Sequence, residues 1–237
     1  MLNTSNDLQI VIIAGGLATR LGKLSVCQPK SMIPINGKPF MEYQLKMLKA
    51  NGFKRVLICL GHLGSQIEEY FGTGKDFGLD IYYSYEEKPL GTAGALKNAE
   101  SMLDDIFYTI YGDSFISLNF SEALRLFKSN NKRALMTVYK NNNCYSPSNT
   151  TVKDNLVIKY DKLNSLFEMN YIEYGVNIFR KDVLAEIPSS TFCDLGSLFN
   201  FLIDKRELLA FEVKERFYEI GSIPGLEDFR KLVNTAK

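Results

Sequence analysis

Several features that would assign a function at once are scarce in this sequence. Its four cysteines, Cys27, Cys59, Cys144 and Cys193, form no CxxC pair and show no other metal-ligand spacing. That scarcity argues against a zinc centre and a disulfide framework, so a reducing compartment is expected. The only histidine, His62, lies in CLGHLGSQ, where a strand-to-helix turn is expected, and it is interpreted as a structural residue of that turn.

An excess of charge and a long apolar run are missing too. The net charge is +1 and the pI is about 7.6, which gives no electrostatic case for nucleic acid as a partner. The one basic cluster, at 128–133, is interpreted as a solvated helix end. The N-terminal stretch MLNTSNDLQIVIIA has no basic segment, and its apolar run is too short for a signal core or a membrane span. No membrane association and a cytoplasmic location are therefore expected.

What remains is the composition of an ordinary globular enzyme, with 46% hydrophobic and 23% charged residues. A chain of 237 residues can form one large α/β domain or two small ones. Because no linker, repeat or low-complexity tract interrupts the sequence, one domain with two lobes around a cleft is predicted.

Apolar runs alternate with amphipathic stretches over the first half of the chain. This pattern predicts a Rossmann-like α/β fold, with a mostly parallel central sheet covered by helices on both faces. The expected strands are 9–14, 55–60, 80–85 and 106–112, and the expected helices are 39–52, 63–72 and 92–103.

The second half of the chain is less regular. The polar stretch KNNNCYSPSNTT, at 140–151, is interpreted as a flexible surface segment. The expected helices are 120–130, 181–187, 194–206 and 223–234, and the expected strands are 133–139, 155–160, 172–179 and 209–213.

The segment IVIIAGGLATRLG, at 10–22, is typical of a loop that holds phosphate. Gly15 and Gly16 directly follow a strand, where missing Cβ atoms let the backbone approach a phosphate. The loop lacks the third glycine of a dinucleotide fingerprint, and the chain has no Walker A string. Arg20 and then Lys30, in QPKSMIPING, would suit a polyphosphate. A glycine turn with two solvated cations is the alternative.

Three stretches together resemble the sugar-1-phosphate nucleotidylyltransferases. They are AGGLATRL…QPKSMIPINGKPFMEYQL, EEKPLGTAGAL at 86–96 and YGDS at 111–114. The order and spacing are similar to the short bacterial enzymes that act as heptose-1-phosphate or mannose-1-phosphate guanylyltransferases. The resemblance implies the nucleotide-diphospho-sugar transferase fold, with a nucleotide-binding lobe at 1–120 and a sugar-phosphate-binding lobe with the C-terminal helices at 121–237.

The resemblance also implies a reaction and the residues of the triphosphate site. A sugar 1-phosphate oxygen attacks the α-phosphate of a nucleoside triphosphate, and pyrophosphate leaves. Such transfer needs charge neutralisation and in-line positioning rather than a general base, which agrees with a site that has no histidine. Arg20 and Lys30 are the expected catalytic residues, and the nucleotide is expected to contact Ala14, Gly15, Gly16 and Gly112.

Two carboxylates are the expected ligands of Mg²⁺. Asp113 follows an expected strand directly, although an aspartate in such a turn is often only a helix N-cap. The resemblance supplies the second acid near the C-terminus, usually an Asp in a D-x-G turn, and here Glu219 takes that position in RFYEIGSIPGLEDF.

The stretch EEKPLGTAGAL is expected to hold the nucleobase, although a loop followed by a capped helix is the alternative. The expected contacts are Glu86, Pro89, Gly91 and Thr92, with Gly91 allowing a flat base to approach. An ionised carboxylate only accepts hydrogen bonds, and guanine offers two adjacent donors where uracil and thymine offer one. Glu86 therefore favours GTP.

The sugar phosphate is expected to contact Asp161, Lys162, Glu173 and Gly175. Here KYDKLN stands where the family often has Glu-Lys-Pro, and Glu173 stands where the family often has Asn. A phosphate acceptor such as phosphocholine with CTP, and a non-catalytic homologue that senses an NDP-sugar, are the alternative functions. A homodimer is left open.

Overall fold

The computed structural model describes residues 8–16, 27–162, 164 and 168–235. The chain divides into two compact units, and each consists of more than one stretch of sequence. Unit 1 contains 1–89, 110–116 and 217–237, and unit 2 contains 90–109 and 117–216. No helix in the described part of the chain is long and apolar enough to cross a membrane.

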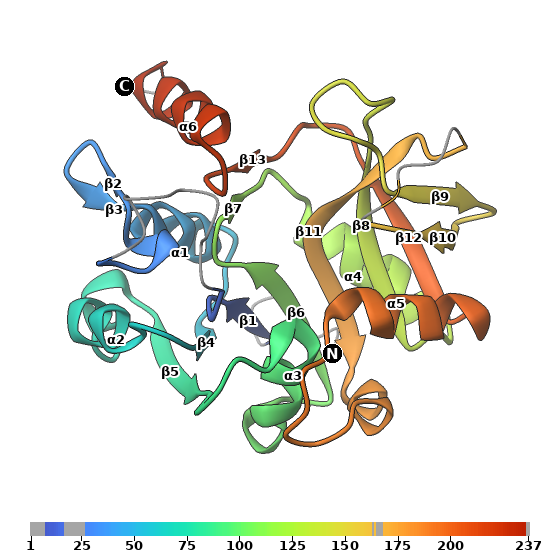
Figure 1. The fold of residues 1–237 in the computed structure, drawn as a ribbon, viewed down its shortest axis with the longest axis horizontal. Helices are drawn as coiled ribbons and strands as arrows, with labels where there is room; N and C mark the ends of the chain where they lie inside the picture. The colour runs from blue at the N-terminus through green and yellow to red at the C-terminus, as the bar shows by residue number, and fades with distance from the viewer. Residues whose placement is uncertain (1–7, 17–26, 163, 165–167, 236–237) are drawn as a thin grey trace. The chain divides into compact units, whose positions relative to one another are not determined.

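Three parallel strands form the centre of unit 1 (Figure 1). They are β1 (Gln9–Ile13), β4 (Arg55–Leu60) and β5 (Asp80–Tyr85), in the order β5-β4-β1. Every residue of β1 is buried, as are five of the six in β4. Continuous apolar runs form such strands because both faces of a parallel sheet are covered. The helices of this part of the chain are α1 (Phe40–Ala50) and α2 (Ser65–Phe71).

Short elements complete unit 1. A hairpin joins β2 (Pro34–Ile35) to β3 (Lys38–Pro39) through Asn36 and Gly37, which both have positive φ as a tight hairpin requires. The strands β7 (Ser114–Phe115) and β13 (Tyr218–Glu219) pair antiparallel, and α6 (Ile223–Thr235) follows. Phe229 of α6 is fully buried and packs edge-on against Phe40, so the C-terminal helix joins the core of unit 1.

Unit 2 has a mixed sheet. The strand β6 (Ile106–Tyr111) begins in unit 2 and ends in unit 1. The order continues as β6-β11-β8-β12-β10-β9, and a contact between β11 and β9 closes the last five strands into a ring. These strands are β8 (Ala134–Lys140), β9 (Thr150–Lys153), β10 (Leu156–Tyr160), β11 (Tyr171–Arg180) and β12 (Leu208–Val213). The helices of unit 2 are α3 (Gly91–Asn98), α4 (Phe120–Ser129) and α5 (Leu195–Asp204).

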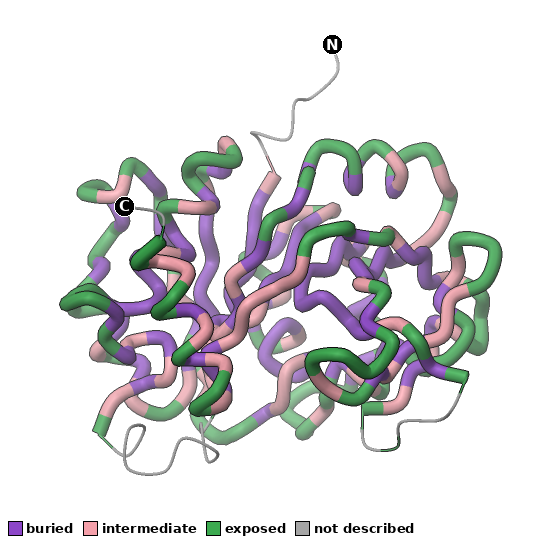
Figure 2. Tube along the Cα trace, turned by 90° about the horizontal axis from the view of Figure 1, so that it is seen from above, coloured by how far each residue is buried: buried purple, intermediate pink, exposed green. Residues whose placement is uncertain are grey.

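Strands and helices both contribute buried residues to the two units, and exposed residues gather in the turns and on one side of the helices (Figure 2). In unit 2 the pair β8–β12 is parallel, while β11–β8, β10–β12 and β10–β9 are antiparallel. The mostly parallel character predicted from the sequence is therefore strongest in unit 1.

Three expectations need correction in unit 2. The predicted helix 92–103 ends at Asn98 and continues only as a 3₁₀ turn, Glu100–Met102, and 181–187 is a 3₁₀ helix, Lys181–Glu186. Arg133, in the basic cluster, pairs with Glu186 at 2.9 Å rather than remaining solvated.

The stretch 140–151 is not simply a polar loop. Asn141 is buried, and its Nδ2 donates to the Ser146 carbonyl oxygen and to Ser148 Oγ. Strand β9 begins within the same stretch, at Thr150. Asparagine and serine therefore supply the internal hydrogen bonds of this turn.

Candidate functional site

The loops that follow β1, β4, β5 and β6 start at one edge of the unit 1 sheet. The backbone N–H of Ala14 donates to the end of β4 at 2.9 Å, and that of Gly112 donates to the end of β1 at 2.9 Å. The N–H of Glu86 donates to the last residue of β4 at 3.0 Å. In open α/β sheets this carboxyl edge is where ligands bind.

Lys30 and Asp113 meet at this edge. Lys30 opens a 3₁₀ turn after Pro29, and its Nζ lies 2.8 Å from Asp113 Oδ2. The two side chains are 16% and 26% exposed, so the pair is accessible from solvent. Asp113 does not cap a helix: it stands between β6 and β7, and Asn119 caps α4. The helix-cap interpretation of Asp113 is therefore wrong.

The two short strands β7 and β13 bring Glu219 beside Asp113. Glu219 is opposite Ser114 in this antiparallel pair, and the backbone N–H of Ile220 donates to the Asp113 carbonyl oxygen at 3.0 Å. Hydrogen bonding between the strands thus places two acids together that are distant in sequence.

Three charged side chains converge around Gly221. A Cβ placed on Gly221 would lie 2.5 Å from Glu219 Oε2, 3.1 Å from Asp113 Oδ2 and 3.2 Å from Lys30 Nζ. Two carboxylates and one ammonium group therefore share a small volume that a side chain at 221 would fill. Carboxylate oxygens are ligands that Mg²⁺ prefers, and this ion completes its shell with water and substrate phosphates. The donor set fits such an ion. In the described part of the chain no group of three or more acidic, histidine or cysteine side chains forms a closed metal cage.

Glu86 lies over the glycine loop. A Cβ on Gly15 would lie 2.7 Å from Glu86 Oε1, and a Cβ on Gly61 would lie 2.6 Å from the same atom. The carboxylate therefore occupies space that glycine leaves at the ends of both β1 and β4. Burial, with the Glu86 charge as a second cause, raises the pKa of the nearby Cys59 thiol to about 12. Cys59 is 2% exposed, which confirms its interpretation as a small buried apolar residue.

Gly91 and Thr92 have structural contacts inside unit 2. Gly91 has a φ of +74°, and a Cβ there would lie 2.6 Å from the Cys193 carbonyl oxygen. Thr92 Oγ1 accepts a hydrogen bond from the Leu195 backbone N–H at 2.8 Å. The glycine is thus explained by backbone packing without any base. The nucleobase contacts predicted for Gly91 and Thr92 remain predictions, as does the contact of the exposed Pro89.

Glu173 is at the centre of a buried polar cluster in unit 2. It is 9% exposed, and its carboxylate accepts from Tyr160 Oη at 3.4 Å and from Asn177 Nδ2 at 3.3 Å. Gly175, with a φ of +95°, lies where the β11 register shifts, and this bulge separates Glu173 from Asn177. Burial and the Glu173 charge raise the pKa of Tyr160, which stays a hydrogen-bond donor.

Asp161 and Lys162 follow Tyr160 directly. Asp161 Oδ1 accepts from the Asn164 backbone N–H at 2.9 Å, so this carboxylate caps its own turn. Lys162 is exposed. Asp161 therefore lies beside the Glu173 cluster, since it interacts electrostatically with Tyr160, whereas no contact joins the exposed Lys162 to that cluster in the described structure.

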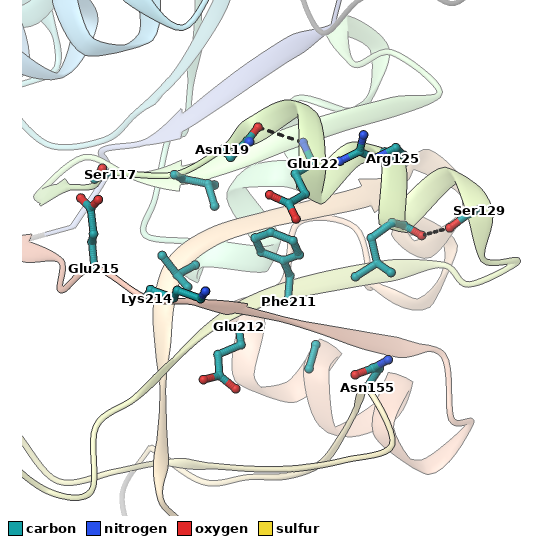
Figure 3. Close-up of a pocket in the computed structure, with 14 residues that line it drawn as sticks. Ser117, Asn119, Glu122, Arg125, Ser129, Asn155, Phe211, Glu212, Lys214 and Glu215 are labelled. Carbon is teal, nitrogen blue, oxygen red and sulfur yellow. Dashed lines mark hydrogen bonds between the residues drawn. The ribbon is translucent and has the colours of Figure 1, made fainter.

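A separate groove of about 850 Å³ lies in unit 2 between α4 and β12 (Figure 3). Glu122 and Arg125 of α4 line one side, and Glu212 and Lys214 line the other. None of the site residues predicted from the sequence lines it.

Comparison with known proteins decides the family. The sequence profile described as "Nucleotidyl transferase" matches residues 9–189, which is more than half of the chain. The chain belongs to the nucleotidyl transferase family. This confirms the resemblance found in the three motif stretches.

Two curated relatives show the range within this family. The chain is 31% identical over 238 residues to a UTP–glucose-1-phosphate uridylyltransferase of Synechocystis, covering 92% of this chain and 61% of that protein. It is 33% identical over 180 residues to a D-glycero-alpha-D-manno-heptose 1-phosphate guanylyltransferase of Campylobacter jejuni, covering 74% and 77%. The chain thus spans about three fifths of the first of these relatives.

Solved structures confirm the fold class predicted for the chain. HddC from Yersinia pseudotuberculosis, complexed with GMP-PN, superimposes with a TM-score of 0.80 at 25% identity, covering 95% of this chain and 99% of that one. A UDP-glucose pyrophosphorylase complexed with UDP-glucose gives a TM-score of 0.79 at 16% identity, covering 97% and 99%, and that likeness concerns the fold alone.

The predicted site residues that the structure describes fall into two groups, apart from the exposed Pro89 at the end of a stretch of unit 1. Those of unit 1 at the sheet edge are Ala14, Gly15, Gly16, Lys30, Glu86, Gly112, Asp113 and Glu219, and those of unit 2 are Gly91, Thr92, Asp161, Lys162, Glu173 and Gly175. Arg20 lies outside the described residues.

Sequence reasoning missed several residues that shape these groups. Gly61 makes room for Glu86, Gly221 makes room for three charged groups, and Tyr160 and Asn177 hold Glu173. The glycines carry no side-chain chemistry, so only the positions of their neighbours reveal them. Two sequence signals were available: a G-x-x-G spacing at Gly61 and Gly64 after a strand, and the glycine of the D-x-G turn, which is Gly221 here.

Proposed function

We propose that this nucleotidyltransferase transfers a nucleoside monophosphate from GTP to a sugar 1-phosphate and releases pyrophosphate. The observation that carries the proposal is the convergence of Lys30, Asp113 and Glu219 around Gly221, next to a glycine loop at a sheet edge. Such a site supplies positive charge and oxygen ligands for metal, and no general base.

The reaction needs no proton acceptor. One oxygen of the sugar phosphate, already anionic at neutral pH, bonds to the α-phosphorus of the triphosphate. The bond from that phosphorus to the bridging oxygen of pyrophosphate breaks, and pyrophosphate leaves with the electron pair. The chemistry therefore requires alignment and neutralisation of charge.

Each residue at the edge has a role in this proposal. The N–H groups of Gly15 and Gly16 contact the triphosphate, the charge of Arg20 is assigned to the same triphosphate from the sequence, and the Lys30 ammonium neutralises charge on the reacting phosphate. Asp113 and Glu219 would hold Mg²⁺. When bound, this ion supplies Lewis-acid stabilisation of phosphate oxygens.

Glu86 supports GTP as the donor. Its carboxylate can accept from the N1–H and N2–H groups of guanine together, whereas uracil offers one donor between two acceptors. Its Oε1 atom lies over the glycines at 15 and 61, which places the carboxylate at the carboxyl edge of the sheet, where the nucleotide is proposed to bind. The relatives carry both guanylyl and uridylyl names, so the preference rests on this side chain.

The buried cluster of unit 2 supports a sugar as the acceptor. Glu173 holds one oxygen toward Tyr160 and the other toward Asn177, and a fixed carboxylate of this kind suits recognition of a sugar hydroxyl. We assign the phosphate of the sugar to the exposed Lys162, which follows Asp161 in sequence, and we assign Asp161 and Gly175 to the binding of the sugar.

A pyrophosphate-release screen tests the function. Four NTPs are combined with a panel of sugar 1-phosphates and with phosphocholine, in the presence of Mg²⁺. We expect release with GTP and a hexose or heptose 1-phosphate. Release with phosphocholine and CTP alone would overturn the sugar acceptor, and binding of an NDP-sugar without release from any pair would identify a sensor. The Asp113→Asn variant serves as the inactive control.

A further inference from the structure

The turn after Glu219 encloses its carboxylate. The Gly221 backbone N–H donates to Glu219 Oε2, and the Ser222 hydroxyl donates to Oε1, both at 2.5 Å. The Ser222 oxygen in turn accepts from the Gly225 backbone N–H at 3.1 Å. Both carboxylate oxygens thus have a donor from the three residues that follow.

Ser222 has two functions in this turn. It directly precedes α6, and its hydroxyl oxygen accepts from the third helical residue, which is the geometry of an N-cap. Because that oxygen accepts from Gly225, its own hydrogen is free to point at Glu219. The cap therefore fixes the direction in which Ser222 donates.

Gly225 explains how the carboxylate fits. Glycine is a poor helix former, and Gly225 has no positive φ that would demand it. A Cβ on Gly225 would collide with the Oε1 atom and the carbonyl oxygen of Glu219. The missing side chain leaves the space into which the glutamate folds back.

This geometry also accounts for a glutamate where the resemblance predicts an aspartate. The extra methylene would carry an extended carboxylate past Asp113. Folding back toward the turn keeps it close, since Oε2 and Asp113 Oδ2 both lie within 3.1 Å of a Cβ on Gly221. The turn compensates for the longer acid.

We propose that Ser222 is a positioning residue that holds the Glu219 carboxylate beside Asp113 and thereby sets the affinity for the divalent cation. The inference rests on the proposed function, in which Asp113 and Glu219 bind that cation. Partners that orient a metal ligand commonly change metal affinity about 10–100-fold when they are removed.

The deciding variant is Ser222→Gly. Glycine is tolerated at an N-cap, so the start of the helix is kept while the hydroxyl donor is lost. We expect Mn²⁺ binding to the substrate-free protein, measured by electron paramagnetic resonance, to weaken about tenfold or more. The Mg²⁺ concentration for half-maximal activity rises by the same factor, and kcat at saturating Mg²⁺ changes less than about threefold.

Three further variants separate positioning from structure. Ser222→Thr keeps the hydroxyl and restores Mn²⁺ affinity to within about twofold of wild type, and Glu227→Ala, which removes an exposed carboxylate from the same helix, leaves it unchanged. In a Glu219→Asp background the shorter acid cannot reach Ser222, so Ser222→Gly has less than about a twofold effect there.

The outcomes distinguish this inference from the proposed function. If Glu219→Ala weakens Mn²⁺ binding and Ser222→Gly does not, the positioning role is overturned and the metal site stands. If Glu219→Ala itself leaves Mn²⁺ binding unchanged, the assignment of Glu219 in the proposed function is wrong, and the inference falls with it.

Discussion

The chemistry proposed for the edge of unit 1 depends on single residues. Lys30 and Asp113 form an ion pair at 2.8 Å that is partly open to solvent, and such pairs contribute little to folding because water screens them. In the proposed function their value is electrostatic: a fixed ammonium and a fixed carboxylate would act on a phosphate and a cation without reorganising during the reaction.

Replacing either member of this pair with alanine is expected to reduce the rate and spare the fold. Lys30→Ala and Asp113→Ala each lower kcat for pyrophosphate release about 100-fold or more. Each changes the free energy of unfolding in urea by less than about 1 kcal/mol, because the pair is part exposed. Lys54→Ala, at an exposed lysine of unit 1, is the matched control. A variant with unchanged kcat would remove that residue from the mechanism.

Glu86 is expected to set the choice of base. Glu86→Gln keeps the size of the side chain but replaces one acceptor with a donor, so guanine loses one of its two matched contacts. We expect kcat/KM for GTP to fall about tenfold or more, consistent with the loss of a hydrogen bond to a charged group, and kcat/KM for UTP to change less. Glu87→Gln, at the exposed neighbour, should leave both values unchanged. An unaltered GTP-to-UTP ratio in Glu86→Gln would contradict the assignment.

At the scale of elements, the sequence predicts those strands and helices that are long enough to show a hydrophobic pattern. The runs 55–60 and 80–85 are strands with those bounds. The first is a continuous apolar run that forms a buried parallel strand, and the second is an edge strand in which buried and exposed residues alternate over much of its length. The pairs β2–β3 and β7–β13 were missed, since a strand of two residues has no period to detect. Yet β7–β13 is the contact that places Glu219 beside Asp113. The resemblance named both acids, and only the structure shows how they meet.

The start of α3 offers a test of backbone packing. Gly91 combines a positive φ with a close approach to the Cys193 carbonyl oxygen, whereas Gly37 has a similar φ of +79° with nothing within 4 Å of an added Cβ. We expect Gly37→Ala to lower the free energy of unfolding by about 1–2 kcal/mol, the cost of left-handed backbone in an alanine. Gly91→Ala should lose about 1 kcal/mol more, because it also clashes. Urea unfolding measures both, and equal losses would show that α3 moves freely away from Cys193.

At the scale of the whole molecule, the two units are interleaved in sequence. Unit 1 draws on three stretches, and its acids at 113 and 219 come from the second and third. The core around Phe229 likewise joins α1 and α6, from opposite ends of the chain. A hydropathy pattern cannot reveal such long-range assembly, because it predicts each stretch only as a strand or a helix and carries no information about which distant stretch it contacts. The predicted division at residue 120 concerns which ligand each part of the chain binds, a nucleotide before it and a sugar phosphate after it, and it stays a prediction.

The buried thiol of Cys59 is expected to report unfolding of the protein as a whole. Burial first, and then the Glu86 charge, raises its pKa from 9.0 to about 12, so at pH 8 the folded protein holds no reactive thiolate in β4. In a variant with serine at positions 27, 144 and 193, a thiol reagent at pH 8 should label Cys59 only through unfolded molecules. Rapid labelling of Cys59 in the folded protein would show that β4 opens locally.

The same thiol makes the free energy of unfolding depend on pH. Between pH 9 and about 12 the Cys59 thiol stays protonated in the folded protein and ionises in the unfolded one. The contribution of Cys59 to the free energy of unfolding is therefore fully present below pH 9 and falls as the pH rises from about 9 to about 12. The free energy of unfolding falls by up to about 1.4 kcal/mol per pH unit over this range because of this one group. In the same background, the free energy of unfolding of Cys59→Ala, measured in urea, should not show this decrease with pH.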